Sequence, residues 1–272
     1  MLERLRRALY RRLRANAKPV PEAQSKPAET PKPVYSAPGY CPACERETTF
    51  TAYKPGLRGA LHCLHCKSVP RERALGRALA QYVPDWRDMA IHECSPAPRG
   101  VSAHMEAECS DYTPTQFYPA EPLGQVHKGF RNENMEKLTF ADERFDLHVH
   151  LDVMEHVNHP DRCFAEMART LKPGGRVIFT TPVDMNRAKS ERRALYTEDG
   201  VQHLAPPEYH GNPASDEGAL VTFLFGADFP DRLQEWAPAF DVEMQNTPDK
   251  HLGILGSHLE VFILTKRPEH VG

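Results

Sequence analysis

The sequence lacks any long hydrophobic run. No apolar segment approaches the roughly 20 residues that a helix needs to cross a bilayer, so we expect no membrane-spanning helix. The first residues also lack the apolar core of a secretory signal peptide, because arginine recurs throughout them. These two absences predict a cytoplasmic protein that reaches a membrane, if at all, only at its surface.

Residues 1–73 are short of acidic side chains. They hold 15 Lys and Arg but 6 Asp and Glu, whereas the remaining residues hold 19 and 31. The total charge of −3 therefore combines a basic amino-terminal part of net +9 with an acidic body of net −12. An excess of positive charge favours an acidic partner such as nucleic acid or anionic lipid. The alternative is a basic tail that only keeps the protein soluble.

The first 16 residues place leucines on one face of a predicted helix. Leu2, Leu5, Leu9 and Leu13 follow at intervals of three and four, and six arginines occupy half of the other positions. This basic amphipathic helix would contact an anionic membrane, RNA or a protein partner; the alternative is a frayed helix without a role. Residues 17–39 are rich in proline, alanine, serine and lysine, which predicts a disordered linker.

Four of the seven cysteines form two pairs with the spacing of metal ligands. Cys41 and Cys44 are separated from Cys63 and Cys66 by 18 residues. Each pair, on a tight turn, directs two sulfurs toward one half of a tetrahedron, so residues 40–70 are predicted to form a zinc ribbon with one structural Zn²⁺. A segment this small has little core, so the metal would supply most of its stability. A redox site is the alternative, but it needs only one such pair.

A strand, a helix and a second strand are predicted within residues 145–182. The first strand is FDLHVHLDV, and Cys163, Phe164, Met167 and Leu171 then mark one face of a helix. Pro173 and Gly174-Gly175 end that helix, and RVIFTTP is β-branched and apolar, as a buried strand requires. Two strands joined by one helix predict a right-handed βαβ unit of a parallel sheet.

This segment closely resembles part of a known enzyme family. FDLHVHLDVMEHV followed by LKPGGRVIFTTP is similar to the strand 4 to strand 5 segment of class I S-adenosylmethionine (SAM)-dependent methyltransferases. The resemblance extends over about residues 86–266. It implies an α/β fold, a doubly wound Rossmann-like sheet of seven strands with the last antiparallel, over residues 71–268. The zinc ribbon precedes it, and SAM is the implied cofactor.

The first loop of the implied cofactor site is poor in glycine. Where the family often has an acid followed by three glycines, MAIHECSPAPRG keeps the acid as Glu93 but only one glycine, Gly100. The resemblance assigns Glu93, Ser95 and Gly100 to cofactor binding. Glycine lets the backbone approach a ligand closely, so this loop departs from the pattern at its functional feature. A subgroup of methyltransferase-like sequences that also carries a zinc ribbon has a similar segment here.

The resemblance implies three further cofactor contacts. Cys109-Ser-Asp111-Tyr-Thr-Pro matches the end of the family's second strand, where a carboxylate accepts hydrogen bonds from both ribose hydroxyls. The alternative is a turn or capping role for Asp111. In GFRNENMEKLTFAD, Asn134 falls where an acid often contacts the adenine amino group, and Met135 where the backbone meets the ring.

Asp152, Glu155 and His156 allow two interpretations. The resemblance places Asp152 at the cofactor. The D-x-x-E-H spacing is also similar to the E-x-x-E-H of quinone-biosynthesis O-methyltransferases, which implies a divalent metal held by Asp152, Glu155 and His156. The EHV segment is common in methyltransferases without a metal, which favours the first interpretation.

The candidate catalytic groups lie on a loop after the last parallel strand. HLAPPEYHGNP contains His203, Glu208 and His210 among prolines that limit its motion. A histidine with a pKa of about 6.5 is mostly neutral at cellular pH and can accept a proton, so we expect one of His156, His203 and His210 to be a base. The alternative is a structural loop with surface histidines. Arg71 and Arg73, ahead of the main domain, are candidates for binding an acid there, unless they are only solvated.

The sequence thus predicts methyl transfer from SAM to an oxygen or nitrogen of a small-molecule or glycan acceptor. RNA methylation is an alternative, because ribosomal RNA methyltransferases also join a cysteine-rich zinc module to this fold. The acidic body and the lack of an aromatic stacking set beside the cysteines disfavour it. A non-catalytic binding protein is a third reading, which the missing glycines favour and the register of Glu93, Asp111 and Asn134 disfavours.

Overall fold

The computed structural model describes residues 31–212 and 215–268. The chain divides into two units, Met1–Lys32 and Pro33–Gly272, and the described residues fall almost entirely in the second. The predicted helix over residues 1–16 and most of the predicted linker lie outside the described residues. Within the described part, no helix is both long and apolar enough to span a bilayer.

The two cysteine pairs sit in a small antiparallel sheet, which with α2 we call the cysteine module (residues 35–68). Its strands are β1 (Tyr35–Cys41), β2 (Arg46–Ala52) and β3 (His62–Cys63), in the order β1-β2-β3, with helix α2 (Leu57–Ala60) before β3. The predicted linker, residues 17–39, overlaps β1, because Tyr35–Cys41 pair along their whole length with Arg46–Ala52. Residues 35–39 therefore belong to the sheet and not to the linker. Pro38 is tolerated because β1 is an edge strand of this sheet.

The main sheet has eight strands. They are β4 (Ala90–Cys94), β5 (Asp111–Gln116), β6 (Val126–His127), β7 (Phe130–Asn132), β8 (Phe145–Leu151), β9 (Leu171–Thr180), β17 (Phe240–Gln245) and β18 (Val261–Lys266). Their spatial order is β17-β18-β9-β8-β4-β5-β7-β6. β4 pairs in parallel with β5 and β8, β8 with β9, and β5 with β7, whereas β18 is antiparallel to both of its neighbours.

This order confirms the predicted fold class. The parallel strands run outward from β4 in both directions, and the last strand of the chain, β18, inserts antiparallel between β9 and β17. That is the doubly wound seven-stranded arrangement that the resemblance implied. The additional two-residue strand, β6, is antiparallel to β7 and lies at the edge.

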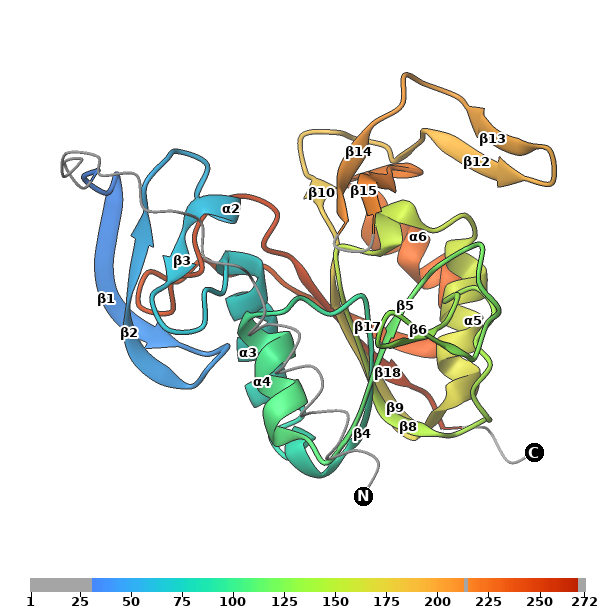
Figure 1. Cartoon of the computed structure of the whole chain (residues 1–272), viewed down its shortest axis with the longest axis horizontal. Coiled ribbons are helices and arrows are strands. Elements are labelled where there is room, and N and C mark those ends of the chain that lie inside the picture. The colour runs from blue at the N-terminus through green and yellow to red at the C-terminus, as the bar shows by residue number, and fades with distance from the viewer. Residues whose placement is uncertain (1–30, 213–214, 269–272) are drawn as a thin grey trace, which may run out of the picture. The chain divides into compact units, whose positions relative to one another are not determined.

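Helices cover both faces of the sheet (Figure 1). On one face lie α3 (Pro70–Tyr82) and α4 (Gly100–Glu108), and on the other α5 (Pro160–Thr170) and α6 (Phe229–Trp236). Each face has its own hydrophobic core: Leu75, Val101 and Met105 belong to one, Phe164 and Leu233 to the other. Pro160 at the first position of α5 fits a helix start, and the apolar stripe of α5 confirms the predicted helical period.

The cysteine module shares its core with the first face. Phe50 and Leu61 from the module belong to the same buried cluster as Leu75 of α3. Arg73 is wholly buried between them, where its guanidinium donates to the carbonyls of Leu61 (3.0 Å) and Gly253 and lies over the Phe50 ring. The expected boundary between residues 70 and 71 therefore falls inside a continuously packed region.

Residues 183–226, after β9, form short strands that are not part of the main sheet. This segment contains β10 (Val183–Asp184), β11 (Glu191–Arg192) and β16 (Phe223–Gly226), which pair in the order β10-β16-β11, and two hairpins. The hairpins are β12 (Ala194–Thr197) with β13 (Gly200–His203), and β14 (Tyr209–Asn212) with β15 (Ser215–Leu220). Thr222 joins this segment to the short helix η2 (Met154–His156), because its N–H donates to the Glu155 carbonyl at 2.8 Å and its hydroxyl to the Val157 carbonyl at 2.6 Å.

Candidate cofactor and acceptor site

The carboxyl ends of the parallel strands meet along one edge of the main sheet. Ser95, Phe117, Asp152 and Thr181 are the first residues after β4, β5, β8 and β9. Ligands of open α/β sheets bind outside this edge, close to the point where strand order reverses. Here that point lies between β4 and β8, so this edge is the candidate site.

Both carboxylate oxygens of Glu93 are hydrogen-bonded inside the protein. Its side chain is fully buried, Oε1 accepts from the Ser102 hydroxyl at 2.6 Å, and Oε2 accepts from the Tyr112 hydroxyl at 2.5 Å. Burial raises the pKa of Glu93 to about 7, against the lowering effect of these two hydrogen bonds. Because both oxygens already have partners, Glu93 anchors the loop to α4 and β5. The geometry therefore favours this anchoring role of Glu93 over the predicted direct contact with the cofactor.

The loop after β4 keeps its shape through backbone contacts. Ser95 has left-handed backbone (φ 54), its N–H donates to the Thr115 carbonyl at 2.9 Å, and its hydroxyl donates to Gln116 Oε1 at 2.7 Å. Gly100 is also left-handed (φ 58), and its N–H donates to the Cys66 carbonyl at 3.0 Å. A side chain at this glycine would collide with the Glu72 carboxylate. Gly100 therefore allows close packing against α3 and against the end of the cysteine module.

Asp111 lies at the wrong end of its strand for the predicted ribose contact. It is the first residue of β5 and pairs with Ala90, the first residue of β4, so it sits at the edge opposite the candidate site. Its half-exposed carboxylate forms a two-point ion pair with Arg144. The prediction failed because the matched segment, Cys109 to Pro114, contains the start of β5 and not its end. Pro114 lies within the strand, and β7 pairs with β5 beyond it, at Thr115 and Gln116.

Gln116 occupies the place on β5 that the prediction gave to Asp111. It ends the strand at the carboxyl edge and holds Ser95. Asn134 and Met135 follow the carboxyl end of β7, at the edge where the resemblance puts them. Asn134 Oδ1 accepts the Glu136 N–H within its own turn, and Met135 is buried in the second core. Their contact with adenine stays a prediction.

Asp152 is held by two arginines. Its Oδ2 lies 2.7 Å from Arg58 Nη2 and 2.8 Å from Arg71 Nε, and its Oδ1 accepts from the Thr180 hydroxyl at 2.9 Å. Burial alone would raise the pKa of Asp152, but Arg71 and Arg58 together outweigh burial and hold it below its usual value. The arginines occupy this carboxylate, so the predicted metal group of Asp152, Glu155 and His156 is not assembled.

His210 takes the place of Asp152 beside the other two residues. Ligand atoms of Glu155, His156 and His210 lie within 4.8 Å of one another. Glu155 Oε1 is 3.8 Å from His156 Nε2 and 3.7 Å from His210 Nδ1, and the two imidazoles meet edge to face. Among the described residues this buried oxygen has no hydrogen-bond partner, whereas Oε2 accepts from the Thr181 hydroxyl. A carboxylate with two imidazoles can hold a proton or a divalent cation.

His210 and Glu208 are close, as predicted, but His203 is not part of the group. Glu208 Oε1 lies 3.6 Å from His210 Nε2. The Glu155 carboxylate raises the pKa of His210 above its usual value. His203 ends the exposed strand β13 and pairs with Ala194 in the separate hairpin. The structure thus brings the predicted Glu208 and His210 together while His203 faces solvent, and the acid and base roles stay predictions.

A cavity of about 290 Å³ adjoins this group. Its charged and polar lining comes from Arg58, Glu155, Asp184, Arg187, Glu208, His210 and His258, and its apolar lining from Pro182 and residues 223–225. The lining therefore combines charged and polar side chains with apolar ones, as a site for a small polar molecule with an apolar part should.

Arg58 and Arg187 line the cavity but were not predicted to be part of the site. Arg71 was a candidate for binding an acid, and it does bind Asp152. Arg58 lies in the spacer between the cysteine pairs and reaches the same carboxylate across 94 residues of chain, a contact that no local pattern reveals. Arg73, the other candidate, binds backbone carbonyls instead.

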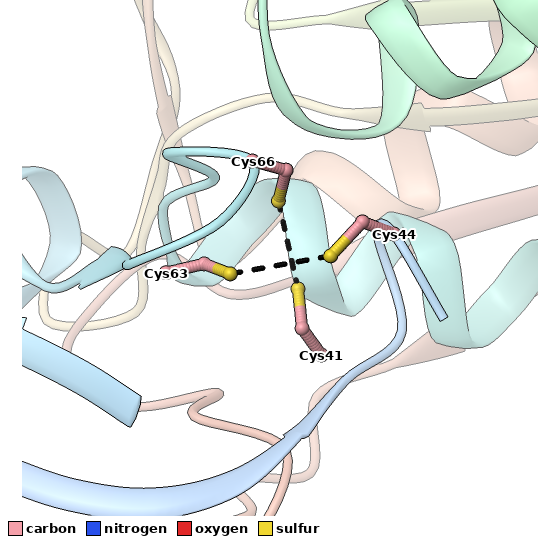
Figure 2. A group of neighbouring side chains, drawn as sticks. All are labelled: Cys41, Cys44, Cys63 and Cys66. Carbon is pink, nitrogen blue, oxygen red and sulfur yellow. Dashed lines mark hydrogen bonds between the residues drawn. The ribbon is translucent and has the colours of Figure 1, made fainter. Parts of the chain in front are cut away.

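The four cysteine sulfurs converge on one point (Figure 2). Cys41 Sγ and Cys66 Sγ are 3.7 Å apart, and Cys44 Sγ and Cys63 Sγ are 4.0 Å apart. Four sulfurs at the usual Zn–S distance of 2.3 Å in a tetrahedron are separated by about 3.8 Å. The residues therefore fit one zinc ion, whose role would be structural because all four positions are filled by protein.

Comparison with known proteins agrees with this geometry. Residues 101–179 match a family described as a methyltransferase domain. The chain is 31% identical over 80 residues to a ubiquinone biosynthesis O-methyltransferase of Coxiella burnetii (29% of this chain, 32% of the relative). It is 36% identical over 88 residues to the protein of that name from Alkalilimnicola ehrlichii (32% and 34%). Over 115 residues it is 29% identical to a ubiquinone/menaquinone biosynthesis C-methyltransferase of Burkholderia mallei (34% and 47%).

Solved structures match the chain at low sequence identity. A SAM-dependent methyltransferase from Mesorhizobium loti is 14% identical, with a TM-score of 0.46 over 71% of this chain and 98% of the other. A Burkholderia thailandensis 1,6-didemethyltoxoflavin N1-methyltransferase, solved with S-adenosylhomocysteine, is 18% identical, with a TM-score of 0.40 over 72% and 78%. The chain spans about a third of the length of the first curated relatives it matches. The matching segment is described as a methyltransferase domain, and the order of the main sheet is that of the class I SAM-dependent methyltransferase fold.

Proposed function

We propose that this protein transfers the methyl group of SAM to a hydroxyl oxygen of a small molecule bound in the cavity beside Glu155 and His210. One observation supports SAM as the methyl donor, which is the donor half of the proposal. The sheet order β7-β5-β4-β8-β9-β18-β17, with β18 antiparallel, occurs together with the methyltransferase match over residues 101–179. The cavity at the carboxyl edge of that sheet supports the acceptor half.

On the donor side the protein mainly has to position its ligand. SAM, when bound, supplies a methyl group activated on a sulfonium. Methyl transfer is an in-line displacement, so correct placement of the two reactants accounts for much of the rate. The loop after β4 is held by Glu93 and Ser95 and the carboxyl end of β8 by Asp152, so both loops flanking the switch point are fixed by side-chain hydrogen bonds.

On the acceptor side a hydroxyl must lose a proton as its oxygen bonds to the methyl carbon. In this proposal neutral His210 takes that proton, and the Glu155 carboxylate 3.7 Å away stabilises the imidazolium that results. The raised pKa of His210 makes it a stronger base. Base catalysis of this kind typically contributes about 10²- to 10⁴-fold. His156 fixes the arrangement, because its Nδ1 is bound to the Leu220 carbonyl at 2.8 Å.

The choice of oxygen rests on chemistry and on the relatives. A neutral amine can attack without prior loss of a proton, whereas a hydroxyl benefits from a base, and the cavity offers one. Two of the relatives are named O-methyltransferases. The third is named a C-methyltransferase, so an acidic carbon is the competing acceptor.

Calorimetric titration of the purified chain with SAM and with S-adenosylhomocysteine tests the donor half. We expect saturable binding of both at one site. A folded protein that binds neither would be a binding protein with a methyltransferase fold. A screen of small phenols and other hydroxyl compounds with radiolabelled SAM tests the acceptor half, and label that ends on carbon or nitrogen would overturn the choice of oxygen.

A further inference from the structure

Two arginines of the amino-terminal part reach the edge of the main sheet where ligands bind. Arg58 is in α2 of the cysteine module, and Arg71 is in the first turn of α3, five residues after Cys66. Both approach the same oxygen of Asp152, the first residue after β8, at 2.7 and 2.8 Å. The three side chains are only 24%, 20% and 16% exposed, so the ion pairs are partly shielded from water.

The guanidinium groups are not saturated by this contact. Among the described residues, Asp152 is the single hydrogen-bond or ion-pair partner of Arg58 and of Arg71. Arg58 Nε is buried without a hydrogen-bond partner, and Arg58 also lines the cavity. A guanidinium has five N–H donors, and a buried donor without a partner is costly. An incoming carboxylate, which accepts two parallel hydrogen bonds, would satisfy donors that Asp152 leaves free.

The nearby charges suit a zwitterion. Glu155 lines the same cavity as Arg58, and the buried Glu260 also lies close enough to interact electrostatically with Arg58. Glu72 faces Arg71 from α3, but it is paired with Arg99 at 2.8 Å. The site therefore combines free guanidinium donors with the Asp152 carboxylate, and an α-amino acid offers the matching carboxylate and ammonium.

The cysteine module also holds the other loop of the candidate site. The Cys66 carbonyl accepts the Gly100 N–H at 3.0 Å, so a residue of the second cysteine pair fixes the start of α4. Arg99, at the end of the loop after β4, is paired with Glu72 of α3. Both sides of the switch point between β4 and β8 are thus tied to the segment that carries the cysteines.

We propose that the cysteine module is a working part of the cofactor site: Arg58 and Arg71, positioned by the zinc-organised fold, bind the amino acid end of the cofactor together with Asp152. This inference rests on the proposed function, and it makes cofactor binding depend on zinc. It also explains how a loop with one glycine suffices, because the module supplies contacts from outside the sheet.

The test compares two ligands that differ only at that end. S-adenosylhomocysteine carries the amino acid, and 5′-methylthioadenosine lacks it. We expect Arg58→Gln and Arg71→Gln each to weaken S-adenosylhomocysteine binding by about 10- to 100-fold, the usual range for a charged hydrogen bond, and to leave 5′-methylthioadenosine binding unchanged. Arg46→Gln, at an exposed position of β2 in the same module, is the matched control and should change neither.

Each result decides one question. If the wild-type chain binds neither nucleoside, the proposed function itself fails. If the wild type binds both and the arginine variants keep the wild-type ratio of the two affinities, the arginines only support the fold and this inference is overturned. The inference is supported if both variants lose the wild-type preference for S-adenosylhomocysteine over 5′-methylthioadenosine while their zinc content and melting temperature are unchanged.

Zinc removal gives an independent check. Protein freed of zinc by a chelator, with the loss verified by metal analysis, should bind S-adenosylhomocysteine at least tenfold more weakly, in line with the lost arginine contacts, and recover when zinc is restored. Unchanged binding in zinc-free protein would overturn the proposed dependence on the module.

Discussion

His92 Nδ1 and His148 Nδ1 lie 2.7 Å apart between adjacent strands β4 and β8. The Thr170 hydroxyl donates to the Glu166 carbonyl, so it accepts from His148 Nε2–H at 2.8 Å. His148 Nδ1 is then the acceptor, and His92 Nδ1–H the donor. His92 Nε2 in turn accepts from the Thr115 hydroxyl at 2.8 Å. One chain of hydrogen bonds therefore crosses the sheet with both imidazoles neutral.

The first prediction is that these buried histidines make the fold sensitive to acid. Burial lowers the pKa of His92 and of His150 to about 3, and that of His148 well below its usual value. In the unfolded chain they titrate near 6.5. Between these values the unfolded state binds more protons, so stability should fall as pH drops below about 6.5. The slope is roughly 1 kcal/mol per pH unit for each histidine.

His150→Phe is the sharpest variant for this effect. Both ring nitrogens of His150 are buried without a hydrogen-bond partner among the described residues, and the ring stacks on Phe179. The variant should lose less stability than the wild type between pH 7 and pH 4 in denaturant unfolding. His203→Ala, at an exposed position, should follow the wild-type curve. Identical pH dependence in His150→Phe and wild type would contradict the assignment.

The second prediction is that substitutions at the two ends of β5 affect cofactor affinity differently. Asp111→Asn should leave S-adenosylhomocysteine affinity unchanged and cost at most about 1 kcal/mol, because its pair with Arg144 is at the surface, opposite the candidate site. Gln116→Ala should weaken binding, because Ser95 then loses its partner at the carboxyl end. Titration of both variants decides, and a large loss in Asp111→Asn alone would restore the original ribose assignment.

The third prediction concerns the base. His210→Ala should lower turnover by about 10²- to 10⁴-fold while SAM affinity stays near the wild-type value. The Glu155 carboxylate raises the pKa of His210, and the base must be neutral, so wild-type turnover should fall as pH drops through a value above 6.5. Glu155→Gln should move this fall to lower pH, because the imidazolium loses its carboxylate neighbour.

Two controls belong to the pH measurement. His203→Ala should retain turnover, since His203 lies in the exposed hairpin outside the group. Activity that disappears with a chelator and returns with Mn²⁺ or Zn²⁺, in protein whose cysteine zinc is intact, would show that Glu155, His156 and His210 hold a metal and would replace the base assignment.

Features that depend on neighbouring residues were predicted well from the sequence, whereas contacts between distant residues were not. The strand–helix–strand unit around α5 and the spacing of the cysteines depend on neighbouring residues, and the structure has both. The position of Asp111 depends on where β5 begins relative to β4, which only strand pairing fixes. Arg58 with Asp152 and His210 with Glu155 are joined across long stretches of chain, so packing alone reveals these contacts.

The last prediction is that the chain binds one zinc ion through Cys41, Cys44, Cys63 and Cys66. Metal analysis of the purified wild type should find one equivalent, and Cys44→Ser should reduce it strongly. Phe50 and Leu61 of the module belong to the core that it shares with α3, so metal loss should disturb that core and lower the melting temperature. Cys163→Ser, which changes a buried cysteine of α5 outside the cluster, should keep the zinc. Zinc-free wild type with an unchanged melting temperature would show that the four cysteines hold no structural metal.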